Sequence, residues 1–135
     1  MDDARRRRYR GKLAHLEERR QDVASWTAGA DPDKKTRLAV YKALQEVIEA
    51  AMDICAMWVA DLGISPQDDY VNVTALRDRG FLGAETVQVL SEANGLRNRL
   101  VHTYNGIDDR RVLEFVSAHL VSFSGFVSAV ERWMA

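Results

Sequence analysis

Apolar residues recur along most of this chain every three or four positions, the spacing that gathers them on one face of an α-helix. The spacing is most regular in residues 32–62, which we therefore expect to form the central core helix. Its predicted buried positions are Leu38, Tyr41, Leu44, Ile48, Ala51, Met52, Cys55, Trp58 and Leu62. Gly63 and Pro66 follow directly and predict the end of this helix.

Other long segments show the same helical spacing, namely residues 3–27, 84–106 and 109–134. The positions expected to face the core are Tyr9, Leu13, Leu16, Arg20 and Val23 in the first segment, Val89, Ala93, Leu96 and Leu100 in the second, and Val112, Val116, His119, Leu120, Phe123, Phe126, Val127, Val130 and Trp133 in the third. A shorter helix is expected before residue 80.

Polar side chains and glycines predict where these helices begin and end, because Asp, Asn and Thr cap helix starts and glycine is favoured just past helix ends. The residues expected in these roles are Asp31 before a helix that begins at Pro32, Asn72 or Thr74 before the short helix, Gly80 and Gly106 at helix ends, and Asp108 before residues 109–134.

No segment alternates apolar and polar residues with the period of two that is typical of a strand. We therefore expect an all-α fold, a single domain over residues 1–135 built as an up-and-down bundle of four long helices and one short helix. The only cysteine, Cys55, has no partner for an internal disulfide, and no apolar run is long enough to span a bilayer. These features predict a cytoplasmic protein without membrane association.

Charge is nearly balanced, with a formal net charge of −1, so any nucleic-acid-binding surface must be local. Arg5–Arg8 together with Arg10 form a basic cluster close to the N-terminus. One interpretation is a solvated helix end, which needs no function. The alternative is an electrostatic footprint for RNA phosphates.

The stretch Leu96–Gly106 concentrates polar chemistry between apolar positions. Its functional side chains are Arg97, Asn98, Arg99, His102 and Tyr104. A permanently charged guanidinium beside an imidazole, which titrates near neutral pH, suits phosphate chemistry. The other interpretation is a helix C-terminus whose basic residues complement the helix dipole. Of the other histidines, His15 is expected on the surface and His119 in the core or an interface, and no pair has the spacing of metal ligands.

Helix geometry limits how Arg97 and His102 can cooperate. On one straight helix they would lie roughly 140° apart. Asn98 and His102, four positions apart, would share a face. Three arrangements remain open: the Arg97 side chain curls around the helix, the helix ends or bends before His102, or each residue meets its counterpart from a second subunit at a two-fold axis.

The order arginine, four residues, histidine, one residue, tyrosine at Arg97, His102 and Tyr104 resembles the R-x4-H-x-Y motif of HepT toxins. These belong to the HEPN superfamily (higher eukaryotes and prokaryotes nucleotide-binding domains). Asn98 also resembles the polar residue that follows the arginine in the superfamily motif. The short helix and the chain length are similar too, so the resemblance covers nearly the whole sequence.

The resemblance implies a HEPN-like bundle that acts as a metal-independent endoribonuclease, the toxin of a type VII-like toxin–antitoxin pair, without a cofactor. A ribose 2′-OH would attack the adjacent phosphate, with His102 as general acid or base and Arg97 stabilising charge on the phosphorane. Asn98 would hold His102 or the phosphate by hydrogen bonds. Two copies of His102 across a homodimer would be able to divide the proton transfers. The implied substrate is single-stranded RNA or tRNA.

The resemblance also implies a partner, a nucleotidyltransferase antitoxin that transfers AMP from ATP to Tyr104. Because the chain is expected to turn at Asn105–Gly106, Tyr104 has no evident packing role and would be accessible to a modifying enzyme. Two other functions stay open from the sequence. One is a HEPN module that binds nucleotides or RNA without catalysis, and the other is a structural helical partner of a nucleotidyltransferase.

Overall fold

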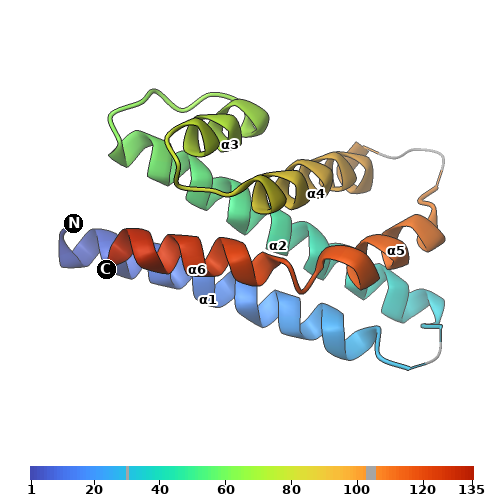
Figure 1. Cartoon of the computed structure of the whole chain (residues 1–135). Coiled ribbons are helices and arrows are strands. Elements are labelled where there is room, and N and C mark those ends of the chain that lie inside the picture. The colour runs from blue at the N-terminus through green and yellow to red at the C-terminus, as the bar shows by residue number, and fades with distance from the viewer. Residues whose placement is uncertain (30, 103–105) are drawn as a thin grey trace.

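The computed structural model describes residues 1–29, 31–102 and 106–135 (Figure 1). Helices account for the regular structure of these ranges, and no strand occurs in them, so the predicted all-α fold is confirmed there. The helices are α1 (Asp3–Trp26), α2 (Lys34–Asp61), α3 (Asp69–Asp78), α4 (Ala84–His102), α5 (Asp109–His119) and α6 (Phe123–Met134).

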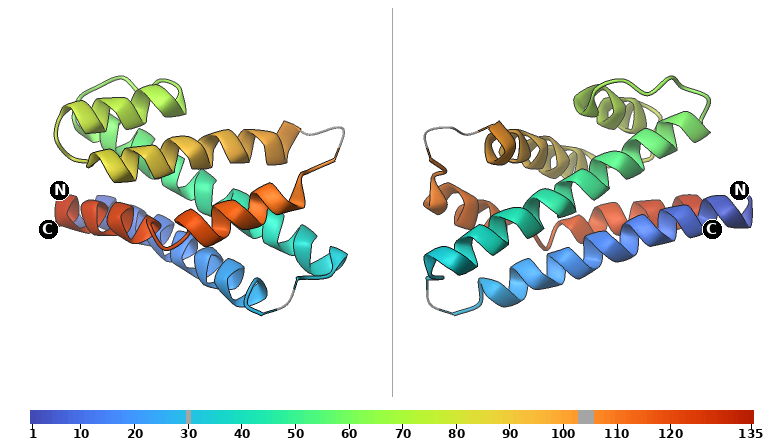
Figure 2. Two further views of the ribbon diagram at one scale, coloured as in Figure 1. Left: turned by 45° about the vertical axis from the view of Figure 1, so that its right-hand side comes forward. Right: turned by 180° about the vertical axis from the view of Figure 1, so that it is seen from behind.

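The long helices run in alternating directions, and the two termini lie beside each other at one end of the bundle (Figures 1 and 2). As predicted, α2 is the central helix: it packs against α1, α3 and α4. Leu44, Ile48 and Trp58 of α2 are completely buried. Trp58 stacks on Trp133 of α6 with ring centroids 5.7 Å apart, which joins the first and last parts of the chain in one core.

The predicted buried stripes of the first and third long helices are largely confirmed. Tyr9, Leu16 and Val23 of α1 are fully buried, and Val89 and Ala93 of α4 are almost fully buried. The stripe of α2 is wrong at its first position. Leu38, in the second turn of α2, is 56% exposed.

The prediction of one helix over residues 109–134 is wrong, because α5 ends at His119, α6 begins at Phe123, and their axes are bent by 52°. Backbone hydrogen bonds between residues three apart carry the chain through the bend, as between Phe123 N and Leu120 O at 3.3 Å. These turns preserve the spacing of apolar positions, so the stripe looks uninterrupted. No single helix of the described ranges is long and apolar enough to cross a membrane, and only the bent α5–α6 pair reaches that composition.

A contact from α1 explains why the chain bends where it does. The Arg20 guanidinium donates to the carbonyl oxygens of Leu120 and Val121, at 3.4 and 3.5 Å, and to Ser124 Oγ at 3.0 Å. Carbonyls at a helix C-terminus lack partners within the helix, and this guanidinium supplies one. Because Arg20 is far from the bend in sequence, no local pattern predicts the break.

The start of α2 also differs from the prediction. Its N-cap is Asp33, whose carboxylate accepts a hydrogen bond from Thr36 N at 2.8 Å, and not Asp31. Two aspartates flank Pro32, and each has the side chain that a cap requires. Local sequence therefore does not choose between them.

The predicted caps of the short helix are wrong as well. Asp68 caps α3 by accepting from Val71 N at 3.0 Å, whereas Thr74 lies inside the helix. Asn72 is buried and holds the preceding loop, since its amide accepts from Gln67 N at 2.8 Å and donates to Gln67 O at 3.2 Å. The cap of α5 by Asp108 is confirmed.

Gly80 ends the short helix as the sequence predicts. Gly80 directly follows the C-cap of α3 and has φ +80°, a left-handed conformation that side chains rarely adopt. Gly106 has φ +92°, and the described part of α4 ends earlier, at His102.

Two arginines of the basic cluster belong to the fold. Arg5 Nη2 lies 2.7 Å from Asp61 Oδ1, and the Tyr9 hydroxyl donates to Asp61 Oδ2 at 2.6 Å. Partial burial acts to raise the pKa of Asp61, but the hydrogen bonds from Arg5 and Tyr9 hold it below its ordinary value. Arg6 donates to the Met134 carbonyl at 3.0 Å. These contacts close the end of the bundle where the termini meet.

Candidate functional site

The motif helix α4 is continuous from Ala84 through His102. The arrangement in which the helix ends before His102 is therefore wrong. Asn94, Asn98 and His102 follow each other at steps of four, so they lie along one face of α4. Along this face the side chains change from buried at Asn94 to half-buried at Asn98 and exposed at His102. This face of α4 thus runs from the core of the bundle to the surface at the end of the helix.

Arg97 is held by residues from its own helix and from two others. Its Nη1 donates to Asn98 Oδ1 at 3.0 Å. Its Nε lies 3.6 Å from Glu49 Oε1 of α2, and its Nη1 lies 3.9 Å from Asp69 Oδ2 of α3. The Arg97 side chain is 29% exposed, so these partners surround it on the protein side and leave part of it open to solvent.

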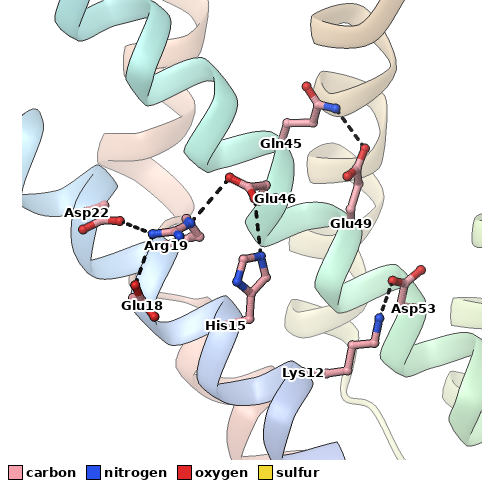
Figure 3. A network of polar contacts seen from close by, with 9 residues as sticks. All are labelled: Lys12, His15, Glu18, Arg19, Asp22, Gln45, Glu46, Glu49 and Asp53. Carbon is pink, nitrogen blue, oxygen red and sulfur yellow. Dashed lines mark hydrogen bonds and ion pairs between the residues drawn. The ribbon is translucent and has the colours of Figure 1, made fainter. Parts of the chain in front are cut away.

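The two carboxylates around Arg97 are themselves supported by neighbours. Glu49 Oε1 accepts a hydrogen bond from Gln45 Nε2 at 3.0 Å, one turn earlier on α2, as Figure 3 shows. Burial raises the pKa of Asp69, and the positive charge of Arg97 opposes this shift. The carboxylates balance the charge of Arg97 and fix where its guanidinium points, in the way that partners orient the groups that act on a substrate.

Sequence reasoning did not find Glu49 and Asp69, since no spacing relates them to the motif. Sequence reasoning placed Arg97 and Asn98 together, and the structure brings them into contact. Within the described ranges, no hydrogen bond or ion pair joins Arg97 to His102. The predicted AMP acceptor, Tyr104, lies outside the described residues.

The remaining histidines take part in polar contacts away from the motif. His15 Nε2 lies 3.6 Å from Glu46 Oε1 in the network between α1 and α2, with 42% of its side chain exposed, which agrees with a surface position (Figure 3). His119 is half-buried; its Nε2 lies 2.7 Å from Glu92 Oε2, and its ring packs 5.3 Å from that of Phe115. Among the described residues, no three His, Cys, Asp or Glu side chains are grouped to hold a metal ion.

Residues 10–130, which include α4 and the whole motif, match the family model described as "Ribonuclease HepT-like". The chain belongs to the HepT-like ribonuclease family. A relative described as a candidate RNase, from Archaeoglobus fulgidus, is 37% identical over 131 residues, which cover 94% of this chain and 93% of that protein. The tRNA nuclease HepT of Aphanizomenon flos-aquae is 29% identical over 101 residues, 73% of this chain and 67% of that protein.

Solved HepT-like structures share the fold. A tri-AMPylated HEPN toxin of Shewanella oneidensis, in complex with an MNT antitoxin, superposes with a TM-score of 0.86 at 22% identity, covering 98% of this chain and 99% of that chain. At this identity the likeness concerns the fold alone. It confirms that the helices of this chain form a HEPN-like bundle.

Proposed function

We propose that this HepT-like chain is a metal-independent endoribonuclease and the toxin of a type VII-like toxin–antitoxin pair. The observation that carries the proposal is membership of a ribonuclease family over residues 10–130, combined with a motif whose Arg97 is oriented and whose His102 is exposed. An oriented cation and an accessible acid–base group are the two requirements of metal-free phosphate transfer.

The proposed reaction is an internal displacement at phosphorus. His102 accepts the proton of a ribose 2′-OH, whose oxygen attacks the adjacent phosphorus, and the bond to the 5′ oxygen of the next nucleotide breaks. The leaving 5′ oxygen takes a proton from solvent, so the products carry a 2′,3′-cyclic phosphate and a 5′-hydroxyl. Arg97 stabilises the added negative charge on the phosphorane oxygens, and Asn98 orients Arg97 through the hydrogen bond between them.

Arg97 and His102 act together most directly in a homodimer. On continuous α4 they diverge, and the Arg97 guanidinium turns toward α2 and α3. A two-fold axis beside the end of α4 would bring Arg97 of one subunit to His102 of the other. Val101, next to the histidine, is 43% exposed, which leaves apolar surface beside the motif for such an interface.

The proposed partner of the toxin is a nucleotidyltransferase antitoxin that modifies Tyr104 with AMP. The support comes from the Shewanella oneidensis toxin, which is tri-AMPylated and bound to an MNT antitoxin in a structure of the same fold. The proposed substrate is single-stranded RNA or tRNA. For tRNA, the support is the named activity of the Aphanizomenon flos-aquae relative.

The reaction is tested by the chemistry of its products. We expect the purified protein to cleave single-stranded RNA in the presence of EDTA and to leave 2′,3′-cyclic phosphate ends, because the nucleophile is the substrate's own 2′-OH. The ends are identified by mass spectrometry of the fragments. A substrate with a single 2′-deoxy nucleotide at the mapped cleavage site should resist cleavage there. A requirement for added divalent metal, or linear 3′-phosphates formed without a cyclic precursor, would contradict the mechanism.

The shared site is tested by mixing subunits. We expect light scattering to give the mass of a dimer at micromolar concentration. Arg97→Ala and His102→Ala proteins are then unfolded, mixed in equal amounts and refolded together. Half of the dimers would be mixed and each would hold one intact site, so about a quarter of wild-type cleavage should return. A stable monomer, or no recovery in a proven dimer, would show that Arg97 and His102 do not act across the interface.

A further inference from the structure

An open groove borders the motif helix on the side away from Glu49. It has a volume of about 570 Å³ and lies between α4 and α5, with α3 at one end, and we call it the α4–α5 groove. Figure 2 shows α4 and α5 lying next to each other in this part of the bundle. The residues that matter for its chemistry are Tyr70 of α3, Glu92, Gly95 and Arg99 of α4, and Arg111 and His119 of α5.

The groove is continuous with the motif. Glu92, Gly95, Arg99 and His102 are spaced by three, four and three positions, so they form one stripe along α4. Following this stripe from Glu92 leads through the groove to the exposed imidazole at the end of the helix. The first turn of α3 strengthens the connection, because Asp69 contacts Arg97 whereas the next residue, Tyr70, lines the groove.

A missing side chain keeps the floor of the groove open. At Gly95, an added Cβ would lie 3.6 Å from the Tyr70 hydroxyl and 3.7 Å from Arg99 Nη2, which are ordinary contact distances. A methyl group would therefore fit, whereas a longer side chain would extend into the space beneath Tyr70. Tyr70 is 45% exposed, so part of its ring remains available to a ligand.

Positive charge is available at the motif end of the groove. Arg111 is exposed, and within the described ranges its guanidinium makes no hydrogen bond or ion pair. The carboxylates that line the groove have partners: Glu92 lies 2.7 Å from His119, which also lines the groove, and Glu114 lies 3.2 Å from Arg110. An anionic group placed between Arg111 and the end of α4 would thus lie beside a guanidinium without a partner among the described residues, whereas the nearby carboxylates already have partners.

We propose that the α4–α5 groove is an RNA subsite that holds the nucleotide flanking the cleavage position, in which Tyr70 stacks on the base and Arg111 binds the phosphate. The inference rests on the proposed ribonuclease function and adds to it the residues that position the strand. A volume of about 570 Å³ lies in the usual range for small-ligand pockets, and an exposed aromatic ring with a basic side chain is the combination that binds single-stranded nucleic acid.

The first test compares two neighbouring arginines of α5. Arg111 lines the groove, whereas Arg110 does not: its side chain is 87% exposed and pairs with Glu114, which does line the groove. Each of Arg111→Gln and Arg110→Gln removes one positive charge, so any difference between them reports position and not net charge. The probe is a fluorescein-labelled 2′-O-methyl RNA 12-mer of mixed sequence, which lacks the attacking hydroxyl and is not cleaved, and binding is followed by fluorescence anisotropy.

We expect Arg111→Gln to weaken binding of this probe about tenfold and to lower the salt dependence of log Kd by about 0.7, the value for one lost phosphate contact on a single strand. Arg110→Gln leaves Glu114 without its partner but removes no groove-lining cation, so it should change both quantities much less. Equal effects of both variants would overturn the subsite, because they would show that only the overall charge of α5 matters.

The second test addresses the base and the floor of the groove. We expect Tyr70→Ala to weaken probe binding about tenfold and Tyr70→Phe to retain it, since stacking needs the ring and not the hydroxyl. Gly95→Leu should block binding, whereas Gly95→Ala should preserve it. Both Gly95 variants raise helix propensity, so loss of binding in only one is not explained by unfolding of α4.

The outcomes separate this inference from the proposed function. If the Arg111 and Tyr70 substitutions weaken RNA binding in a protein that cleaves no RNA, the subsite is supported and the proposed nuclease activity is contradicted. If Gly95→Leu and Tyr70→Ala change neither RNA cleavage nor RNA binding, the subsite is contradicted and the proposed nuclease activity still stands. Light scattering of each variant tests the other possible occupants of the groove. If a second copy of the chain or the antitoxin covers the groove, these substitutions would change the assembly and leave RNA binding unchanged.

Discussion

His102→Ala should lower the rate of RNA cleavage by about 10³-fold, and Arg97→Ala by about 10²–10³-fold, the losses typical of removing a general acid–base group and a charge-stabilising donor. His102 is exposed at the end of α4, so its removal costs little packing. The rate is measured with a fluorogenic RNA at fixed pH under single-turnover conditions. Cleavage that survives the loss of His102 would refute its proposed role.

The Arg97 variant needs a control for stability, because its guanidinium balances Glu49 and Asp69. Removing it leaves two neighbouring carboxylates without their cation, and we expect a modest fall in Tm with the helical circular-dichroism spectrum retained. Arg77→Ala is the matched control: Arg77 lies at the surface of α3, is 49% exposed and pairs only with the adjacent Asp78 among described residues. It should keep both stability and activity, so that activity lost only in Arg97→Ala reports catalysis.

The spacing of apolar residues predicted those features of the fold that depend on neighbouring residues in the sequence. The helical stripes of α1, α2 and α4 were predictable because burial of one face imposes a spacing of three and four residues. The positions of Arg97, Asn98 and His102 on one helix followed from the same spacing. The angular divergence of Arg97 and His102 was also predictable, and α4 now excludes the alternative in which the helix ends before the histidine.

The features that sequence reasoning missed depend on contacts between distant segments. The bend between α5 and α6 is stabilised by Arg20 of α1, and Arg97 is anchored by Glu49 and Asp69 from two other helices. Such contacts leave no periodic signal in the sequence. Misplaced caps have a different cause. Asp31 and Asp33 are each chemically able to cap α2, and α3 begins at Asp69, before the predicted caps Asn72 and Thr74.

Tyr104→Phe should retain most of the nuclease activity and yet escape neutralisation by the nucleotidyltransferase. In the proposed modification the phenol oxygen attacks the α-phosphorus of ATP, the bond to pyrophosphate breaks, and the phenol proton is lost to solvent. The phenol itself takes no part in the cleavage chemistry assigned to Arg97 and His102. The acceptor position is two residues past the last described residue of α4, so each transferred AMP would add a phosphate charge and bulk next to the motif.

A phosphate beside Arg97 and His102 would compete with the RNA phosphate for the same positive charge, by the logic of a phosphorylated side chain next to a basic site. Intact mass after incubation with the partner, ATP and Mg²⁺ is the decisive measurement: the wild type should gain one or more AMP units and Tyr104→Phe none. Tyr70→Phe is the control, because Tyr70 is another exposed tyrosine and its loss should leave modification unchanged. AMP gained equally by Tyr104→Phe would place the acceptor elsewhere. An unmodified but inhibited wild type would mean that the antitoxin silences the toxin by covering its site.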